Sequence, residues 1–287
     1  MPDPLPADVR SESGETMVEV MTRAGVAPSL RARGPAFSVV RRCLEVQARA
    51  KPRGAIARFL GRSPLHPDAR TWYQGALGER EIARVLANLG PEWSVLNAVP
   101  IGASGRDIAH VLVGPPGIFT LSTQHHNGRK AFAGGRSLRI DGHPTDYIRM
   151  SVYEGARAAK ALSAASGGIV HVQPAIILVG VSSLVRGAKE SPVEVMLCTE
   201  LLSWLHGMPR RLAPETVSYF GEIAEERSTW HLQIVAPNQT LQYVERFHAL
   251  ELEATDANRR ARLVRFVAIT TGMVALAAAV LIGFWGS

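Results

Sequence analysis

The chain has 287 residues, enough for one sizeable globular domain with additional segments, and its Lys and Arg residues exceed its Asp and Glu residues by 7. Its two cysteines, Cys43 and Cys198, exclude a disulfide framework and a cysteine-based metal site, and they favour a reducing, cytoplasmic setting. The first 25 residues lack an apolar run, so we expect no secretory signal peptide.

The positive charge is concentrated in one early segment. Residues 31–70 contain ten basic side chains against Glu45 and Asp68, which accounts for the whole surplus. We expect residues 1–69 to form a basic, partly disordered arm, with a weak helix at 15–23 and one or two basic amphipathic helices over 36–60. Such an arm can meet nucleic acid or anionic lipid headgroups. The alternative is a solvated arm without a partner, because the segment is rich in Pro, Gly and Ser.

Residues 70–235 are expected to form the main domain. Apolar residues recur at helical spacing from Leu77 to Leu89, where Gly90 and Pro91 end the helix. Apolar or alternating runs between turn residues indicate strands at 93–99, 107–113, 118–124, 130–133, 138–140, 175–181 and 193–197. Further helices are expected at 145–165, 200–208 and 214–226. This order predicts an α/β fold with one mixed sheet.

The last part of the chain has two regions of opposite character. Residues 236–265 are expected to form a charged juxtamembrane helix. Residues 266–285 carry no charged side chain, and a helix of that length spans about 30 Å, the thickness of the hydrocarbon core of a membrane. Four arginines precede this segment, so the positive-inside rule predicts a single-pass protein of the plasma (inner) membrane with a cytoplasmic N-terminal domain. A buried core helix is the alternative.

Residues able to carry chemistry gather around the strands expected at 107–113 and 118–124. Alternation along a strand puts Ser122 and Gln124 on one face, toward the region that Asp107 reaches if the two strands pair. Glu79, on the preceding helix, is a second acid that can approach. Metal-dependent hydrolysis of a phosphodiester requires two carboxylates that bind Mg²⁺ and a lysine that offsets negative charge in the transition state. The second strand carries neither a carboxylate nor a lysine at these positions.

The same segments resemble the nuclease-related domain family, NERD, a relative of the PD-(D/E)xK nucleases. The resemblance covers residues 72–232 and implies a restriction-endonuclease-like mixed sheet flanked by helices, followed here by one C-terminal transmembrane helix. It is carried by Trp72-Tyr73-Gln74-Gly75-Ala76-Leu77-Gly78-Glu79, Asp107-Ile108-Ala109-His110-Val111-Leu112-Val113-Gly114-Pro115, Phe119-Thr120-Leu121-Ser122-Thr123-Gln124-His125-His126 and Ser228-Thr229-Trp230.

The resemblance implies a role for each matching position. Glu79 matches the helix acid of the family and Asp107 the acid that begins the strand, and both would bind metal weakly. Ala109 replaces the second Asp of the family's pattern. Ser122 stands where nucleases of this class have the second metal-binding Glu, and Gln124 stands where they have the catalytic Lys. The site is therefore degenerate, and Mg²⁺ or Mn²⁺ is expected only if it is catalytic. No small-molecule cofactor is expected.

Other polar residues near this site allow two interpretations each. His110, His125 and His126 could bind Zn²⁺, or the pair at 125–126 is a polar loop, as in the family. Lys130 could reach back to the lost ammonium position. The run Gly102–Gly105 could cradle a phosphate or serve as a flexible connection. The candidate nucleic-acid contacts are Arg106, His125, His126 and Lys130.

Two functions stay open at this point. One is a membrane-anchored interaction module on the cytoplasmic face, which binds nucleic acid or protein through a degenerate nuclease fold. The other is a metal-dependent DNA endonuclease of low activity. We favour the first because the changes at Ser122 and Gln124 remove the chemistry more than the fold. Basic segments could also press the domain against anionic lipid.

Overall fold

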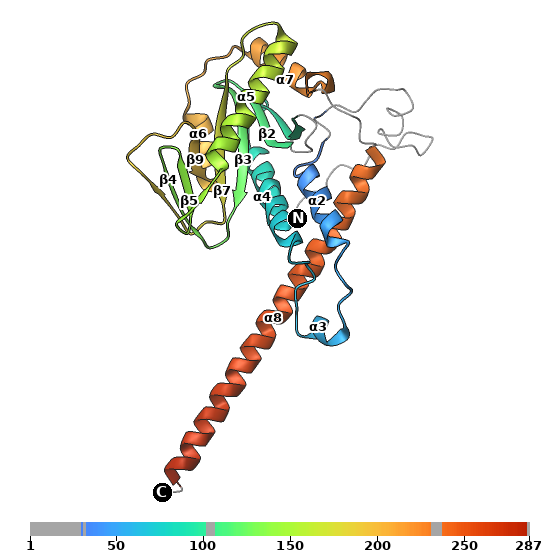
Figure 1. Cartoon of the computed structure of the whole chain (residues 1–287), viewed down its shortest axis with the longest axis vertical. Coiled ribbons are helices and arrows are strands. Elements are labelled where there is room, and N and C mark those ends of the chain that lie inside the picture. The colour runs from blue at the N-terminus through green and yellow to red at the C-terminus, as the bar shows by residue number, and fades with distance from the viewer. Residues whose placement is uncertain (1–29, 31–32, 102–106, 231–236, 286–287) are drawn as a thin grey trace, which may run out of the picture. The chain divides into compact units, whose positions relative to one another are not determined.

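The computed structural model describes residues 30, 33–101, 107–230 and 237–285. Its contacts divide the chain into two compact units (Figure 1). The first comprises the described parts of Met1–Val39 and Tyr73–Thr240, and the second those of Val40–Trp72 and Leu241–Ser287. The expected helix at 15–23, the run Gly102–Gly105 and Arg106 lie outside the described residues. The domain boundaries expected from the sequence stay predictions.

A five-stranded mixed sheet forms the centre of the first unit. Its order is β1-β2-β3-β7-β9, with antiparallel pairing from β1 to β3 and parallel pairing from β3 to β9. Gly114 is required in the turn between β2 and β3, because a Cβ there would lie 2.2 Å from the ring of Trp93. The five strands are β1 (Ser94–Pro100), β2 (Asp107–Gly114), β3 (Gly117–His125), β7 (Val172–Val179) and β9 (Glu194–Leu197).

Helices cover both faces of this sheet, which confirms the predicted α/β class. On one face Ile82, Leu86 and Leu205 pack in a core with Phe119 and Leu121 of β3. On the other face the core joins α5 and α7 to β1 and β2, and Figure 1 shows α5 crossing β3 and β7. The helices are α4 (Ala69–Leu86), α5 (Tyr147–Ser166), α6 (Leu201–Gly207) and α7 (Pro214–Glu225), with short 3₁₀ turns η2 (Cys198–Glu200) and η3 (Arg227–Trp230).

The expectation of a single sheet is wrong, because four strands form a second one in the order β6-β5-β4-β8. The division occurs at Gly128 and Gly180, both in the left-handed conformation at φ 72°. The amide of Gly128 donates to the carbonyl of Gly180 at 2.7 Å. The segments that follow β3 and β7 therefore bend at the same level before β4 and β8 pair in parallel. These strands are β4 (Lys130–Gly134), β5 (Ser137–Ile140), β6 (His143–Thr145) and β8 (Ser183–Arg186).

The second unit is helical. It contains most of α2 (Phe37–Gln47) and α8 (Pro237–Trp285), together with α3 (Ala55–Phe59). Helix α8 is continuous from the charged region into the apolar region. Within it, Gln242–Ala278 is long and apolar enough to cross a membrane, and its apolar window is not buried against the described chain.

Candidate functional site

Strands β2 and β3 diverge at the end that carries the candidate residues. Their antiparallel ladder ends at His110 and Leu121. Beyond this point Asp107 continues in the ladder with β1, and Ser122 and Gln124 continue in the ladder with β7. Extending the β2–β3 register places Asp107 level with Gln124. The acid and the two neutral polar residues therefore lie on strands that separate at this end of the sheet.

Helix α4 is held close to the end of β3 by a glycine. A Cβ at Gly78 would lie 3.0 Å from Cβ of His125 and 3.3 Å from Cγ2 of Thr123, so a larger residue would push the helix away. The ring of His125 adds a second link, because Nδ1 lies 2.9 Å from the carbonyl oxygen of Gln74 and donates to it. This close approach brings Glu79, the next residue on α4, to the open end of the sheet.

Glu79 lies near two other acids at this end of the sheet, Asp107 and Glu154. Burial, together with the nearby carboxylates of Asp107 and of Glu154 on α5, raises the pKa of Glu79 to about 8. The carboxyl group is therefore mostly protonated at neutral pH. A protonated carboxyl is a poor ligand for a hard divalent cation, which binds through ionised oxygens.

Asp107 is held by Arg33, which precedes α2, and by Ser38, which lies in the first turn of α2. Nη2 of Arg33 lies 2.8 Å from Oδ2 of Asp107, and the hydroxyl of Ser38 donates to the same oxygen. The side chains of Arg33 and Asp107 are only 17% and 7% exposed. The guanidinium of Arg33 also lies 4.5 Å from the centre of the Phe37 ring and 3.3 Å from the hydroxyl of Ser38. The positive charge beside Asp107 is thus supplied by the protein itself.

Ser122 and Gln124 contact one another. Nε2 of Gln124 donates to Oγ of Ser122 at 3.1 Å, and Ser122 is buried. This contact agrees with the prediction that the two side chains share one face of β3. Neither residue brings a charge, so the pair supplies no carboxylate and no ammonium to the site.

Taken as they stand, these residues do not fit a Mg²⁺ or Mn²⁺ site. One acid is ion-paired with Arg33, the second is largely protonated, and the strand residues are neutral. Within residues 30, 33–101, 107–230 and 237–285, no group of three or more His, Cys, Asp or Glu side chains is placed to hold a metal ion. The roles that the family resemblance implies for Glu79, Asp107, Ser122 and Gln124 stay predictions.

The three histidines have separate partners. His110 is fully buried in β2, with Nδ1 2.8 Å from the side-chain oxygen of Asn97, and burial lowers its pKa to about 3. His125 bonds to α4, whereas Nε2 of His126 lies 3.1 Å from the hydroxyl of Tyr147. Burial and the neighbouring Arg129 lower the pKa of His126. The structure does not bring the three rings together as zinc ligands.

Lys130 lies away from the acids as the first residue of β4. Its side chain is exposed, and its amide donates to Oδ1 of Asp141 at 2.8 Å. The residue thus belongs to the second sheet, on the surface that continues from His126.

Sequence reasoning missed Arg33, Ser38 and Glu154. Nothing local marks Arg33, because it lies 74 positions before Asp107 and inside a block of many basic residues. Glu154 had a usable signal, because it shares a helix face with the buried Ser151, Gly155 and Ala158. An acid on a face that is otherwise small and buried indicates a polar environment underneath.

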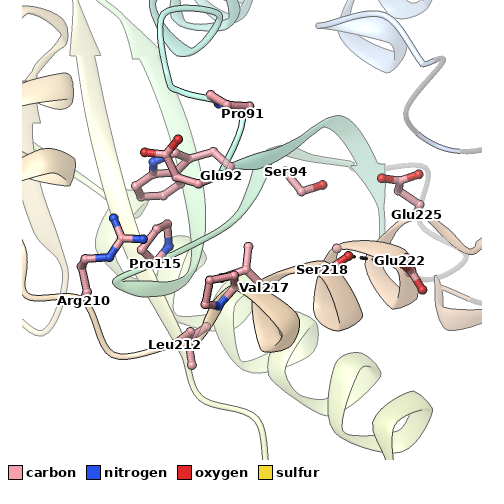
Figure 2. A pocket seen from close by; sticks show the side chains of 13 residues that line it. Pro91, Glu92, Ser94, Pro115, Arg210, Leu212, Val217, Ser218, Glu222 and Glu225 are labelled. Carbon is pink, nitrogen blue, oxygen red and sulfur yellow. Dashed lines mark hydrogen bonds between the residues drawn. The ribbon is translucent and has the colours of Figure 1, made fainter.

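A separate cavity of about 480 Å³ lies at the other end of β2 and β3, around their connecting turn (Figure 2). It is lined by Pro115 of that turn and by residues of α7. Figure 2 shows Glu92, Glu222 and Glu225 around it, with Arg210 as the basic residue. Three carboxylates against one guanidinium make this cavity unsuited to a phosphate group.

A mixed sheet covered by helices on both faces, with acids where two of its strands diverge, is the architecture of a nuclease-like α/β domain. Residues 74–179 match the nuclease-related domain family, NERD, and the chain therefore carries a nuclease-related domain. The match extends from α4 to the end of β7 and includes Glu79, Asp107, Ser122 and Gln124. No curated protein and no solved structure matches the chain significantly.

Proposed function

We propose that the chain is a single-pass membrane protein whose NERD domain faces the cytoplasm and binds nucleic acid without cutting it. The observation that carries the second half of this proposal is the ion pair between Arg33 and Asp107, 2.8 Å long and largely buried. A nuclease of this class needs that carboxylate for a metal ion. Here a guanidinium and the Ser38 hydroxyl occupy its Oδ2 atom.

The proposed binding surface runs along the loop after β3 and the outer side of β4 and β5. Residues 125–140 contain four basic residues and no acid, and all four are exposed: Arg129, Lys130, Arg136 and Arg139. Asp141 is the nearest acid in sequence and pairs with Arg129 at 3.3 Å. Phosphate contacts by exposed cations supply most of the affinity of sequence-independent binding. His125 and His126 border this surface as hydrogen-bonding groups.

The membrane half of the proposal rests on α8. Its span at 266–285 follows Arg259, Arg260, Arg262 and Arg265, and a cluster of arginines on one side of a span favours the cytoplasmic side. This orientation keeps both cysteines in a reducing compartment, in agreement with the absence of a disulfide among the described residues.

A metal-dependent DNA endonuclease of low activity is the second candidate. It is favoured by one observation, the burial of Glu79 beside the carboxylates of Asp107 and Glu154, which raises the pKa of Glu79. Acids that raise one another's pKa often mark functional sites. This candidate requires that Arg33 leaves Asp107 when substrate or metal binds.

Binding is tested with the full chain in lipid nanodiscs, by fluorescence anisotropy of labelled DNA and RNA over a range of salt concentrations. We expect binding that weakens steeply with salt. The magnitude of the slope of log K against log salt concentration should fall by about 1 relative to the parent in each single variant, Lys130→Ala and Arg139→Ala. Lys160→Ala is the matched control, because Lys160 is an exposed lysine on α5. Equal slopes for all three variants would remove the proposed surface, and a protein partner would become the better hypothesis.

Cleavage is tested by incubating supercoiled plasmid with the same full chain and Mg²⁺ or Mn²⁺, beside an Asp107→Ala variant. We expect the two proteins to leave the plasmid equally intact. Nicking that disappears in Asp107→Ala would favour the endonuclease.

A further inference from the structure

Helix α3 exposes an apolar cluster. Ile56 is 76% exposed, Phe59 is 73% exposed and Leu60 is 38% exposed. Their spacing of three and four residues places them on one side of the helical turn. Large apolar side chains grouped on a surface mark a place where a partner or a membrane removes them from water.

The loop that carries this cluster is fixed in place by specific hydrogen bonds. At its base, Nε2 of Gln47 donates to the carbonyl of Pro64 at 2.8 Å, and the amide of His66 donates to Oε1 of Gln47 at 2.9 Å. Nearer the tip, the guanidinium of Arg53 donates to the carbonyl of Arg62. The apolar side chains are therefore presented by an ordered loop.

The loop packs directly against α8 (Figure 1). Gly61, in the left-handed conformation at φ 67°, lies so close that a Cβ there would be 2.2 Å from the backbone nitrogen of Ala261 and 2.5 Å from the carbonyl oxygen of Ala257. The guanidinium of Arg53 also pairs with Glu253 of α8. These contacts determine which level of α8 the apolar cluster adjoins.

That level lies shortly before the proposed span at 266–285. Ala261 precedes Phe266, the first residue of the span, by five residues, which is about 7–8 Å at the helical rise of about 1.5 Å per residue. The headgroup layer on each side of a bilayer is roughly 5–8 Å thick. If the hydrocarbon core begins at Phe266, the end of the loop at Gly61 lies at the level of the headgroup layer.

The charges around the cluster fit an anionic lipid surface. Lys51, Arg58 and Arg62 are exposed on the same loop. Glu253, an acid of α8 beside the loop, is already paired with Arg53. Apolar side chains surrounded by cations are what a helix lying in the interface of an anionic leaflet requires.

We propose that the loop from Lys51 to Arg62 docks onto the anionic leaflet beside the span, with Ile56 and Phe59 inserted at the boundary between headgroups and acyl chains. Lys51, Arg58 and Arg62 contact lipid phosphates. The inference deepens the proposed function and rests on the span at 266–285. Its consequence is a second attachment point, which limits rotation of the second unit about the axis of the span.

The test places a spin label at position 56 or 59, as Ile56→Cys or Phe59→Cys, in a Cys198→Ser background. Cys43 stays in place because it is buried and burial raises its pKa to about 11, so it reacts slowly with the label. The matched control is a label at Tyr219→Cys, because Tyr219 is a large side chain on α7 that is 49% exposed. The full chain is reconstituted in phosphatidylcholine vesicles with or without phosphatidylglycerol.

For each label we compare the rate of collision with oxygen, which concentrates in lipid, with the rate of collision with a water-soluble nickel chelate. We expect the ratio of the first rate to the second to be severalfold higher for labels at 56 and 59 than for the label at 219. Adding phosphatidylglycerol should increase this ratio, and the double variant Arg58→Glu, Arg62→Glu should remove the increase. Equal ratios at 59 and 219 would overturn the docking. Insertion without any effect of phosphatidylglycerol would overturn the assignment of lipid phosphates.

Resistance of the chain to extraction by alkaline carbonate is measured on the same vesicles. If the chain resists extraction but the label at 59 is exposed to water, the proposed span is supported and the proposed docking is overturned. A chain that is extracted overturns the span and the docking together.

Discussion

Removing Arg33 should destabilise the first unit, because it leaves the carboxylate of Asp107 buried without its cation. Loss of one partner of a buried ion pair typically costs about 3–5 kcal/mol. We expect about 3 kcal/mol for Arg33→Ala, the lower end of that range, because Arg33 is 17% exposed and Ser38 still donates to Asp107. For a unit of this size, about 3 kcal/mol lowers the melting temperature by roughly 6–12 °C.

The assay is a double-mutant cycle with Arg33→Ala, Asp107→Ala and the combination, followed by circular dichroism during heating of the full chain in detergent micelles. If the pair is coupled, the double variant should lose less stability than the sum of the single variants, by about 2 kcal/mol. Arg42→Ala is the control, since Arg42 pairs with Glu45 at 3.0 Å while both side chains are about half exposed, 52% and 47%. Such a surface pair contributes about 0–1 kcal/mol. Additive losses at 33 and 107, or losses no larger than that of the control, would refute the argument.

Three other predictions follow from the same region. Glu79→Gln should leave stability nearly unchanged near pH 4 and increase it relative to the parent at pH 8. The pKa of the Glu79 carboxyl rises from 4.5 to about 8 on folding, so this group disfavours the folded state increasingly as pH rises through that window, by at most about 1.4 kcal/mol per pH unit. Equal melting curves of the two proteins at both pH values would contradict this. Gly78→Ala should lower the free energy of unfolding by about 1–3 kcal/mol, because it forces α4 away from His125. Gly207→Ala is the control and should be nearly neutral, because a Cβ there meets nothing within 4 Å. Similar melting temperatures of the two variants would argue against the close approach of α4 to β3. Cys43 should react with a thiol reagent at pH 8 only after unfolding, because it is buried and burial raises its pKa to about 11; rapid labelling of the folded chain would be inconsistent with its packing.

Much of the first unit was predictable because its signals are local. Alternating apolar residues and the Gly114–Gly117 turn predicted β2 and β3, and the helical repeat from Leu77 onward predicted α4. Alternation along β3 also predicted that Ser122 and Gln124 would share a face, and they are hydrogen-bonded.

The parts that were not predicted depend on long-range contacts or on backbone conformation. The second sheet arises from left-handed glycines at 128 and 180, and a glycine in a sequence does not reveal the sign of its φ angle. The contact of Arg33 with Asp107 joins distant segments, and one arginine among many carries no pairing signal. The packing of Gly61 against Ala261 is of the same kind. In each case the local pattern allows several outcomes, and tertiary packing selects one.

The central claim is that Arg33 takes the place of a metal ion at Asp107. Binding of Mn²⁺ to the full chain, followed by electron paramagnetic resonance of the free ion, tests this claim most directly. We predict that the parent chain and Asp107→Ala bind equally little Mn²⁺. A site that the parent chain fills and Asp107→Ala loses would contradict the claim and restore the metal-dependent nuclease as the better account.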